Sequence, residues 1–509
     1  MILFGRQWSA TDLPILFFVP GLLLVTLARD LVPFLDDHNA LRPAVMAFQL
    51  IFIFLCLITY QGAIKISKAA TWLLGAFFLS ATVSTVMSDH PWQGVVRLAE
   101  IITLCLFILA LTNYYRPYGY KKSYERFAIS CLIFLAAIVI TIYVVTGLVI
   151  PDAKNINWVH EPPVFSNIRF ASHLFIIVIP LIYGRIITDN SNRLPIFYFF
   201  LITAIWAFSI WSGGRAAILL LTGVTIWIMI RHIRLMIWVI PAIATGYFIG
   251  SELPSVSHSQ DFIRPVEDGS PLEKLNALSS GRVYLWLGSL ELWWNHNFWF
   301  GIGADGFQYL IPAIGTQSVS HPHSLLFQIL TSYGFVGFAL LTMLSTITLI
   351  KYWAASEVKM SHFYFMSIIS VIFLSMVDGN LYHSLSLIFF SIILSAWLAN
   401  SAHAIGHYYT SRSGGWVLIT PLISITLTAL VQIWGLNQQW KLPTRFFIDY
   451  PLYVHGNLVT SDVSSDATDA EIINFLKAEH PNPCRLPYFG ISLTEQEEAR
   501  FCLPSEPPM

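Results

Sequence analysis

Residues 279–337 read SSGRVYLWLGSLELWWNHNFWFGIGADGFQYLIPAIGTQSVSHPHSLLFQILTSYGFVG. This polar and aromatic stretch interrupts a series of apolar segments. It opens on Arg282, runs through a tryptophan-rich helix and a glycine turn, and closes on His321 and His323, where the next apolar segment begins. An arginine and a histidine held at a membrane surface can bind phosphate and accept a proton. We therefore expect the chemistry here, on a scaffold formed by the rest of the chain.

The composition is that of a membrane protein. Of the 509 residues, 56% are hydrophobic and only 11% are charged, whereas a soluble domain carries about 25% charged residues. The mean hydropathy is +0.65. The net charge of −1 points to no particular partner, and we expect no nucleic acid. The first apolar run, Leu13 to Leu27, is followed by Arg29 and Asp30 and not by a small-residue cleavage site, so no cleavable signal peptide is expected.

Apolar runs of about 20 residues predict membrane helices, because each must cross roughly 30 Å of hydrocarbon. They predict an all-α fold, a polytopic transmembrane helix bundle of about 12 to 13 helices. We divide the chain into N-terminal helices in 1–250, a large loop with interfacial helices in 251–322, C-terminal helices in 323–435 and a polar tail in 436–509. The predicted spans are residues 13–29, 43–61, 70–88, 94–113, 127–150, 169–187, 195–211, 214–230, 235–250, 323–350, 361–378, 380–399 and 415–435.

The short links between spans set the orientation, because lysine and arginine concentrate on the cytoplasmic side. With the N-terminus in the cytoplasm, that side receives Arg6, Lys65, Lys68, Arg116, Lys121, Lys122, Arg126, Arg185, Arg193, Arg231, Arg234, Lys351, Lys359 and Arg412. The 251–322 loop is then periplasmic, in a multi-pass protein of a bacterial inner membrane. An odd number of spans places the tail in the periplasm too. Cys484 and Cys502 could form a disulfide there, whereas in a cytoplasmic tail they would be two thiols.

Three arginines are expected at the outer ends of helices. Arg169 lies at the head of a span, Arg215 follows Gly213 and Gly214, and Arg282 opens the tryptophan-rich helix. Glycines let a backbone approach a ligand closely, and a helix N-terminus attracts anions. The three arginines could bind one strongly anionic lipid group, such as a diphosphate. The alternative is that each only contacts lipid phosphate at the interface.

His321 and His323 flank Pro322 where the loop meets the next span. A His-x-His pair can bind a metal ion, but the zinc-site spacings and a carboxylate-rich partner motif are missing from the sequence. A single histidine that titrates near neutral pH is a better general base. The alternative is that the histidines cap a helix at the interface.

The arrangement resembles bacterial O-antigen ligases and the related polysaccharide polymerases. The resemblance covers roughly residues 160–400, and its elements come in a specific order: FSNIRFASHL, Arg215, Arg282, GIGADGF with Gly301, Gly303 and Phe307, His323 with Ser324, and Gly334 with Gly337. By position, His323 and not His321 matches the family's catalytic histidine. Ser324 stands where the family more often has Asn. The span and tail beyond residue 415 depart from the family's twelve spans, which leaves the subfamily and the acceptor open.

The resemblance implies an inverting glycosyltransferase that needs no metal ion and no other cofactor. Its donor would be a glycan on undecaprenyl diphosphate, and its acceptor a hydroxyl of the glycolipid lipid A–core. His323 would be the general base, and Arg215 and Arg282 would neutralise the diphosphate. Further substrate contacts are assigned to Arg169, His321, Ser324, Gly303 and, in the DGNLYHS element, Asp378 and His383. For the DGNLYHS element we favour a structural role.

Three alternatives stay open. The acceptor could be another lipid-linked repeat unit, as in a polymerase of O-antigen or exopolysaccharide, or it could be a protein such as pilin. From another class, a transporter or lipid flippase would also be a bundle of many helices. Transporters usually show internal repeats and ionisable or helix-breaking residues near the membrane midplane. In this sequence the candidate residues gather at outer helix ends, which favours surface chemistry.

Overall fold

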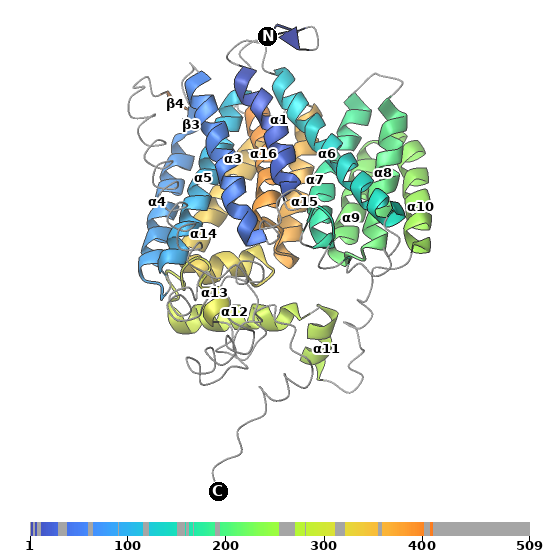
Figure 1. The fold of residues 1–509 in the computed structure, drawn as a ribbon. Coiled ribbons are helices and arrows are strands. Elements are labelled where there is room, and N and C mark those ends of the chain that lie inside the picture. The colour runs from blue at the N-terminus through green and yellow to red at the C-terminus, as the bar shows by residue number, and fades with distance from the viewer. Residues whose placement is uncertain are drawn as a thin grey trace, which may run out of the picture.

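The computed structural model describes residues 2–3, 6–7, 12–28, 38–59, 65–89, 91–115, 122–149, 158, 162–165, 167–188, 194–253, 270–279, 281–310, 321–354, 359–401 and 408–410. Within them the chain is a bundle of helices, which confirms the all-α prediction (Figure 1). Strands are limited there to short pairs: β1 (Ile2–Leu3) with β2 (Arg6–Gln7), and β3 (Lys65–Ser67) with β4 (Tyr408–Thr410).

Every span predicted before residue 251 is a helix, because each apolar run satisfies its own backbone hydrogen bonds in lipid only as a helix. After the loop, the spans predicted from 323 to 399 are helices as well. The bounds are α1 Leu13–Thr26, α3 His38–Thr59, α4 Lys68–Val86, α5 Pro91–Tyr115, α6 Lys122–Val149, α7 Ile168–Thr188, α8 Leu194–Trp211, α9 Arg215–Arg231, α10 Met236–Glu252, α14 Leu325–Ala354, α15 Lys359–Val377 and α16 Ser384–Ser401.

Among the described residues, eight helices are long and apolar enough to cross a membrane, and three shorter apolar helices lie in the same bundle. The chain is therefore a multi-pass membrane protein. The span predicted at 415–435, the tail at 436–509 and its Cys484 and Cys502 lie outside the described residues. The predicted domain boundaries remain a prediction.

One predicted span is not a single helix. Residue Gly334 inside α14 has φ 65° and ψ −170°, which is not a helical conformation. Only glycine adopts such a backbone readily. The segment from Leu325 to Tyr333 is thus a separate short helix, and a second helix follows Gly334. The sequence predicted one continuous span over 323–350, because the apolar pattern does not change at this glycine.

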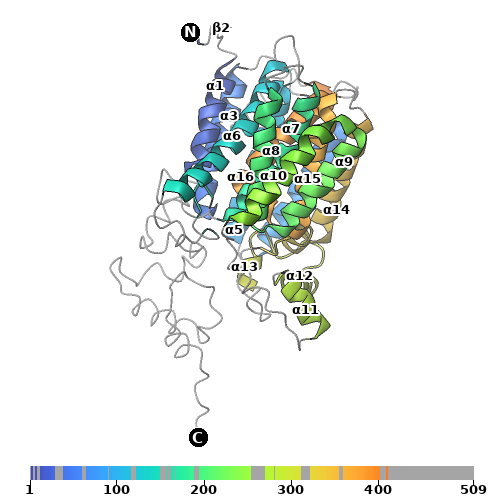
Figure 2. The ribbon, with the colours of Figure 1, turned by 90° about the vertical axis from the view of Figure 1, so that its right-hand side faces the viewer.

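Helix α7 lies at the centre of the bundle. It packs against α6, α8, α9, α15 and α16, and its residues from Ala171 to Gly184 are all buried. On one side of the bundle α8 packs along α10 (Figure 2). The N-terminal ends of α7 and α9 lie at the same end of the bundle, so arginines from different spans come together there.

Three helices outside the bundle mark that end. Helices α11 (Pro271–Leu278), α12 (Arg282–His296) and α13 (Phe307–Leu310) lie across it, and we call it the α12 end (Figure 1). The N-terminal strands and the β3–β4 pair lie at the opposite end. Helix α12 packs on α14, while its Trp294 is 69% exposed. This is the arrangement expected of an interfacial helix with an aromatic outer face.

Candidate active site at the α12 end

The head of α12 is fixed by local hydrogen bonds that determine where Arg282 lies. Gly281 precedes the helix with φ 83°, a left-handed conformation that suits glycine. The Oγ of Ser279 accepts the backbone N–H of Val283 at 3.2 Å, and Oδ1 of Asn276 accepts that of Tyr284 at 3.1 Å. These side chains satisfy amides that the first turn of a helix leaves unpaired. Arg282 therefore starts from a rigid backbone.

The same helix holds the histidine turn. The indole N–H of Trp286 donates to the carbonyl of Pro322 at 3.1 Å, and its ring stacks on Phe327 with centroids 5.7 Å apart. His323 has φ 51°, a left-handed conformation that is uncommon outside glycine. A strained backbone persists when its surroundings over-determine it. Here the contacts from α12 fix the turn that carries His323.

The glycines of GIGADGF anchor the loop to the bend in α14. The backbone N–H groups of Ile302 and Gly303 donate to the carbonyls of Thr331 at 2.9 Å and Ser332 at 3.1 Å. Those of Phe335 and Val336 donate back to Phe298 and Trp299. A Cβ on Gly301 would overlap the α14 backbone, and one on Gly334 would overlap that of Trp299. The two chain segments touch backbone to backbone, which explains these glycines structurally.

The carboxylate of Asp378, just after α15, lies at the centre of the site. Its Oδ1 is 3.6 Å from Nη2 of Arg282 and 3.9 Å from Nδ1 of His323, and its Oδ2 is 4.0 Å from Nε2 of His173 on α7. Burial alone would raise the pKa of Asp378. The nearby His173, followed by the Arg282 and His323 charges, outweighs burial and holds the pKa below its usual value. The aspartate is an anion that links three elements.

Two of the three predicted arginines, Arg169 and Arg282, lie near this anion, and Arg215 lies within electrostatic range of Arg169. Arg169, on the first turn of α7, lies within electrostatic range of Asp378, Arg282 and Arg215. Asn167 fixes that turn, because its Oδ1 accepts the Arg169 backbone N–H at 2.9 Å. Arg215 is the exposed first residue of α9, after Gly213 at φ 66°. Three cations against one carboxylate leave a net positive charge, which suits an anionic ligand.

The two histidines of the turn have different surroundings. The side chain of His323 is 33% exposed, whereas the whole of His321 is only 4% exposed. The ring of His321 stacks on Tyr382 with centroids 4.2 Å apart and 13° between the planes. The structure therefore brings His323 to the accessible site and encloses His321 behind it.

The remaining predicted residues are buried in packing contacts. Ser324 is 2% exposed and its carbonyl accepts the Gln328 N–H at 2.8 Å. His383 is 6% exposed and lies against Phe170, with centroids 4.0 Å apart. A Cβ on Gly303 would overlap the side chain of Ser88. The contacts described for these residues are packing contacts and not contacts with the three arginines. In the described chain no group of three or more His, Cys, Asp or Glu residues is placed to hold a metal ion.

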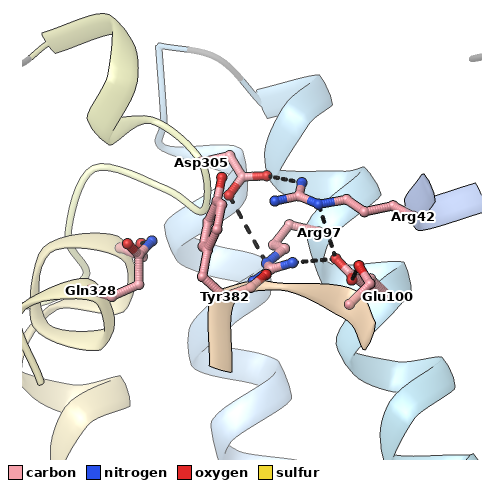
Figure 3. Close-up of polar contacts among 8 residues, drawn as sticks. Arg42, Arg97, Glu100, Asp305, Gln328 and Tyr382 are labelled. Atoms are coloured by element: carbon pink, nitrogen blue, oxygen red, sulfur yellow. Dashed lines mark hydrogen bonds and ion pairs between the residues drawn. The ribbon is translucent and has the colours of Figure 1, made fainter. Parts of the chain in front are cut away.

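A second group of charges was not predicted from the sequence. Arg42 donates to Asp305 at 2.9 Å and is 4.0 Å from Glu100, while Arg97 pairs with Glu100 and is 4.0 Å from Asp305 (Figure 3). We call Arg42, Arg97, Glu100 and Asp305 the ion network. Arg42 and Arg97 lie on the same side of the Tyr382 ring in Figure 3, each with its guanidinium carbon 4.8 Å from the ring centroid. The ion network is nearly buried, with side chains 5 to 13% exposed.

A signal for the ion network did exist in the sequence. Arg97 and Glu100 are charges inside an otherwise apolar run. Ionisable residues in a membrane span are costly and are kept for pairing or function. Likewise His173 follows shortly after Arg169 in the FSNIRFASHL segment, and the structure adds it to the site through Asp378 and through its hydrogen bond with Ser386 at 2.9 Å.

Comparison with known proteins adds one finding about this segment. Residues 196–342 match the family model described as O-antigen ligase. The matched range runs from α8 to the span after Gly334, and it contains Arg215, Arg282 and His323. Arg169 and Asp378, which the structure brings to the same place, lie outside it. Among curated proteins, none matches the chain.

Proposed function

We propose that the chain, whose residues 196–342 match the O-antigen ligase family model, belongs to that superfamily and transfers a glycan from undecaprenyl diphosphate to an acceptor hydroxyl at the periplasmic face of a bacterial inner membrane. The most fitting acceptor is lipid A–core. One observation carries the proposal. Asp378 lies at one end of the membrane bundle, close to Arg169, Arg282 and the accessible His323. Arg215 lies within electrostatic range of Arg169. That constellation offers an anion site and a base side by side.

The arginines would hold the leaving group. Undecaprenyl diphosphate departs as an anion, and charge grows on the oxygen that was bonded to the sugar. Arg215 and Arg282 present planar donors that bind two phosphate oxygens at once, and Arg169 adds a third charge. Such donors stabilise charge that develops in the transition state without having to reorganise. They supply the role that a metal ion has in other phosphate-leaving reactions.

His323 would be the general base. The 3.9 Å between its Nδ1 and Asp378 favours the tautomer with the proton on Nδ1, which leaves Nε2 as the proton acceptor. Nε2 takes the proton of the acceptor hydroxyl, and the hydroxyl oxygen bonds to the anomeric carbon. The bond between that carbon and the diphosphate oxygen breaks in the same displacement. Attack opposite the leaving group inverts the anomeric centre.

The other predicted contacts have narrower roles in the proposal. Asp378 orients Arg282 and His323 and does not meet the diphosphate, which it would repel. The burial of Ser324, His383 and His321 favours packing behind the site over direct contact with the glycan. Gly303 shapes the loop next to α14. The structural role expected for the DGNLYHS element thus extends to organising the charged groups.

The acceptor distinguishes a ligase from a polymerase and from a protein glycan ligase. The purified protein should be given a glycan on undecaprenyl diphosphate alone, with lipid A–core, or with pilin. A ligase forms product only when lipid A–core is present. Elongated lipid-linked glycan formed from the donor alone would instead identify a polymerase. Product formed only with pilin would identify a protein ligase. Translocation of the donor across vesicles without any new glycosidic bond would contradict the proposal and support a flippase.

A further inference from the structure

Tyr382 connects the ion network to the histidine turn. It belongs to the short 3-10 helix η7 (Asn380–Tyr382) between α15 and α16 and is 5% exposed. Arg42 and Arg97 lie over its ring, and the carbonyl of Tyr382 accepts a hydrogen bond from Arg97 at 3.3 Å. Burial, together with the Asp305 charge, raises the pKa of the Tyr382 phenol above its ordinary value. The ring is therefore a neutral, fixed surface.

The stacked His321 has little room to move. One face of the His321 ring stacks on Tyr382, and Gly379 lies close to its Nε2 atom. A Cβ on Gly379 would overlap that atom. The ring of His383 lies edge-on to His321, with centroids 5.5 Å apart and 87° between the planes. The DGNLYHS element thus forms one wall of a slot for the His321 ring, and its glycine is the residue that opens the slot.

The ion network keeps that wall in place. Asp305 comes from the GIGADGF loop, Arg42 from α3, and Arg97 and Glu100 from α5. Burial alone would raise the pKa of Asp305, but Arg42 and Arg97 hold it below its usual value, so the aspartate stays charged. Glu100 also accepts the Ser384 hydroxyl at 2.7 Å. Two guanidiniums and two carboxylates balance, which gives a buried group with no net charge around η7.

We propose that Tyr382 is a positioning residue, which holds His321 by stacking and so fixes the His321–Pro322–His323 turn that carries the proposed base. This inference rests on the proposed function of His323. Only two peptide bonds separate His321 from the strained backbone of His323, and Pro322 restricts the turn between them. A displacement of the base by about 1 Å can lower turnover by up to roughly 100-fold. In this account His321 acts through the shape of its ring and not through its nitrogens.

Paired substitutions separate ring shape from chemistry. In the purified full-length protein, His321→Ala and Tyr382→Leu remove the stack, whereas His321→Phe and Tyr382→Phe keep a flat ring in place. Gly379→Ala leaves all of these residues intact but fills the slot. We expect the three disruptive variants to lose between about 10-fold and about 100-fold in kcat, with the donor KM changed by less than about twofold. His321→Phe and Tyr382→Phe should keep most of the wild-type kcat, because each keeps a flat ring in the stack.

A matched control accounts for the glycine change. Gly223→Ala lies on α9, where an added Cβ meets nothing within 4 Å, and should behave as wild type. Thermal unfolding in detergent shows whether a variant is folded. If Tyr382→Leu does not fold, His321→Ala, His321→Phe and Gly379→Ala still test the positioning role. Equal losses in His321→Phe and His321→Ala would overturn the inference, as would normal turnover in Gly379→Ala. A raised donor KM at unchanged kcat would make His321 a substrate contact and also overturn it.

A second readout does not depend on glycan transfer. The rate at which diethyl pyrocarbonate modifies His323 is followed by mass spectrometry in each variant. We expect that rate to change by at least about twofold in His321→Ala, Tyr382→Leu and Gly379→Ala, and to stay at the wild-type value in both phenylalanine variants and in Gly223→Ala. If wild type transfers no glycan but these rates change as expected, the proposed function fails and the positioning role stands. If wild type transfers glycan and the rates do not change, the positioning role fails alone.

Discussion

The Asp378 carboxylate lies 3.6 Å from the Arg282 guanidinium and so joins the link after α15 to the head of α12. This pair ties the loop to the bundle at the position where the other candidate residues gather. Its strength comes from partial burial, since each side chain is 17% exposed and solvent screens the pair only in part. Several expectations for the whole site depend on this link.

Replacing Asp378 with Asn should lower both stability and turnover. The pKa of Asp378 is lower in the folded protein than the value of about 3.9 for an unfolded chain. Its contribution to stability is therefore complete above that unfolded value and is lost as the pH falls through the lower folded pKa. Thermal unfolding in detergent should show a lower melting temperature for Asp378→Asn at pH 7 and a smaller loss on acidification. Glu291→Gln, exposed on α12, is the control. Equal acid sensitivity in the variant and wild type would argue against this role.

Arg215→Lys and Arg282→Lys should each be severely impaired in transfer. Lysine keeps the positive charge but loses the planar fork that binds two phosphate oxygens. A charge-assisted hydrogen bond that is lost in the transition state corresponds to a reduction of about 10-fold to about 100-fold in kcat/KM. Initial rates with purified variants measure the effect. Arg234→Lys, exposed at the end of the bundle opposite to α12, should keep wild-type rates. Normal rates in both lysine variants of the site would mean that charge alone suffices.

Gly334→Ala should destabilise the fold. The residue has φ 65°, and a Cβ would overlap the backbone of Trp299. A backbone with this φ and a ψ of −170° is essentially restricted to glycine and costs an alanine about 1 to 3 kcal/mol, and the overlap adds to that cost. Gly334→Ala should melt at a lower temperature than wild type, while Gly223→Ala should melt at the wild-type temperature. An unchanged melting temperature for Gly334→Ala would show that the bend in α14 is not required.

The orientation in the membrane is tested by reporter fusions. The bias of lysine and arginine predicts that fusions after Lys122 and after Arg234 report the cytoplasm. A fusion after His296, at the end of α12, should report the periplasm. The structure places α12 and the N-terminal strands at opposite ends of the bundle, as this orientation requires (Figure 1). A cytoplasmic signal after His296 would remove the site from the side where the lipid-linked donor is expected.

The spans and several candidate residues could be predicted from the sequence for a simple reason. Apolar runs of sufficient length form helices in lipid irrespective of their neighbours. The positions of Arg215, Arg282 and His323 at helix heads follow from where those runs begin. The fold class was confirmed, and the catalytic roles of these residues stay predictions until variants are measured.

The rest depends on packing between distant segments. Asp378 looked structural because nothing in DGNLYHS shows that Arg282 and His323 lie beside it. His173 lies inside the span predicted over 169–187 and received no role there, although the structure places its Nε2 4.0 Å from Oδ2 of Asp378. Arg42 and Asp305 meet from a membrane helix and the loop. The bend at Gly334 was missed because glycine is tolerated in membrane helices, and only the close approach of Trp299 requires a non-helical backbone there.

The central claim is that His323 is the general base of a transfer reaction without a metal ion. The most direct measurement is the turnover of lipid-linked glycan to product by purified wild type and His323→Ala, with a divalent-metal chelator present. Removing a general base lowers the rate by about 10²- to 10⁴-fold. We expect a loss of that size in His323→Ala, a smaller loss of about 10-fold to about 100-fold in His321→Ala, and wild-type turnover in His296→Ala, an exposed histidine at the end of α12. Near-normal turnover in His323→Ala, or a wild-type enzyme stopped by the chelator, would contradict it.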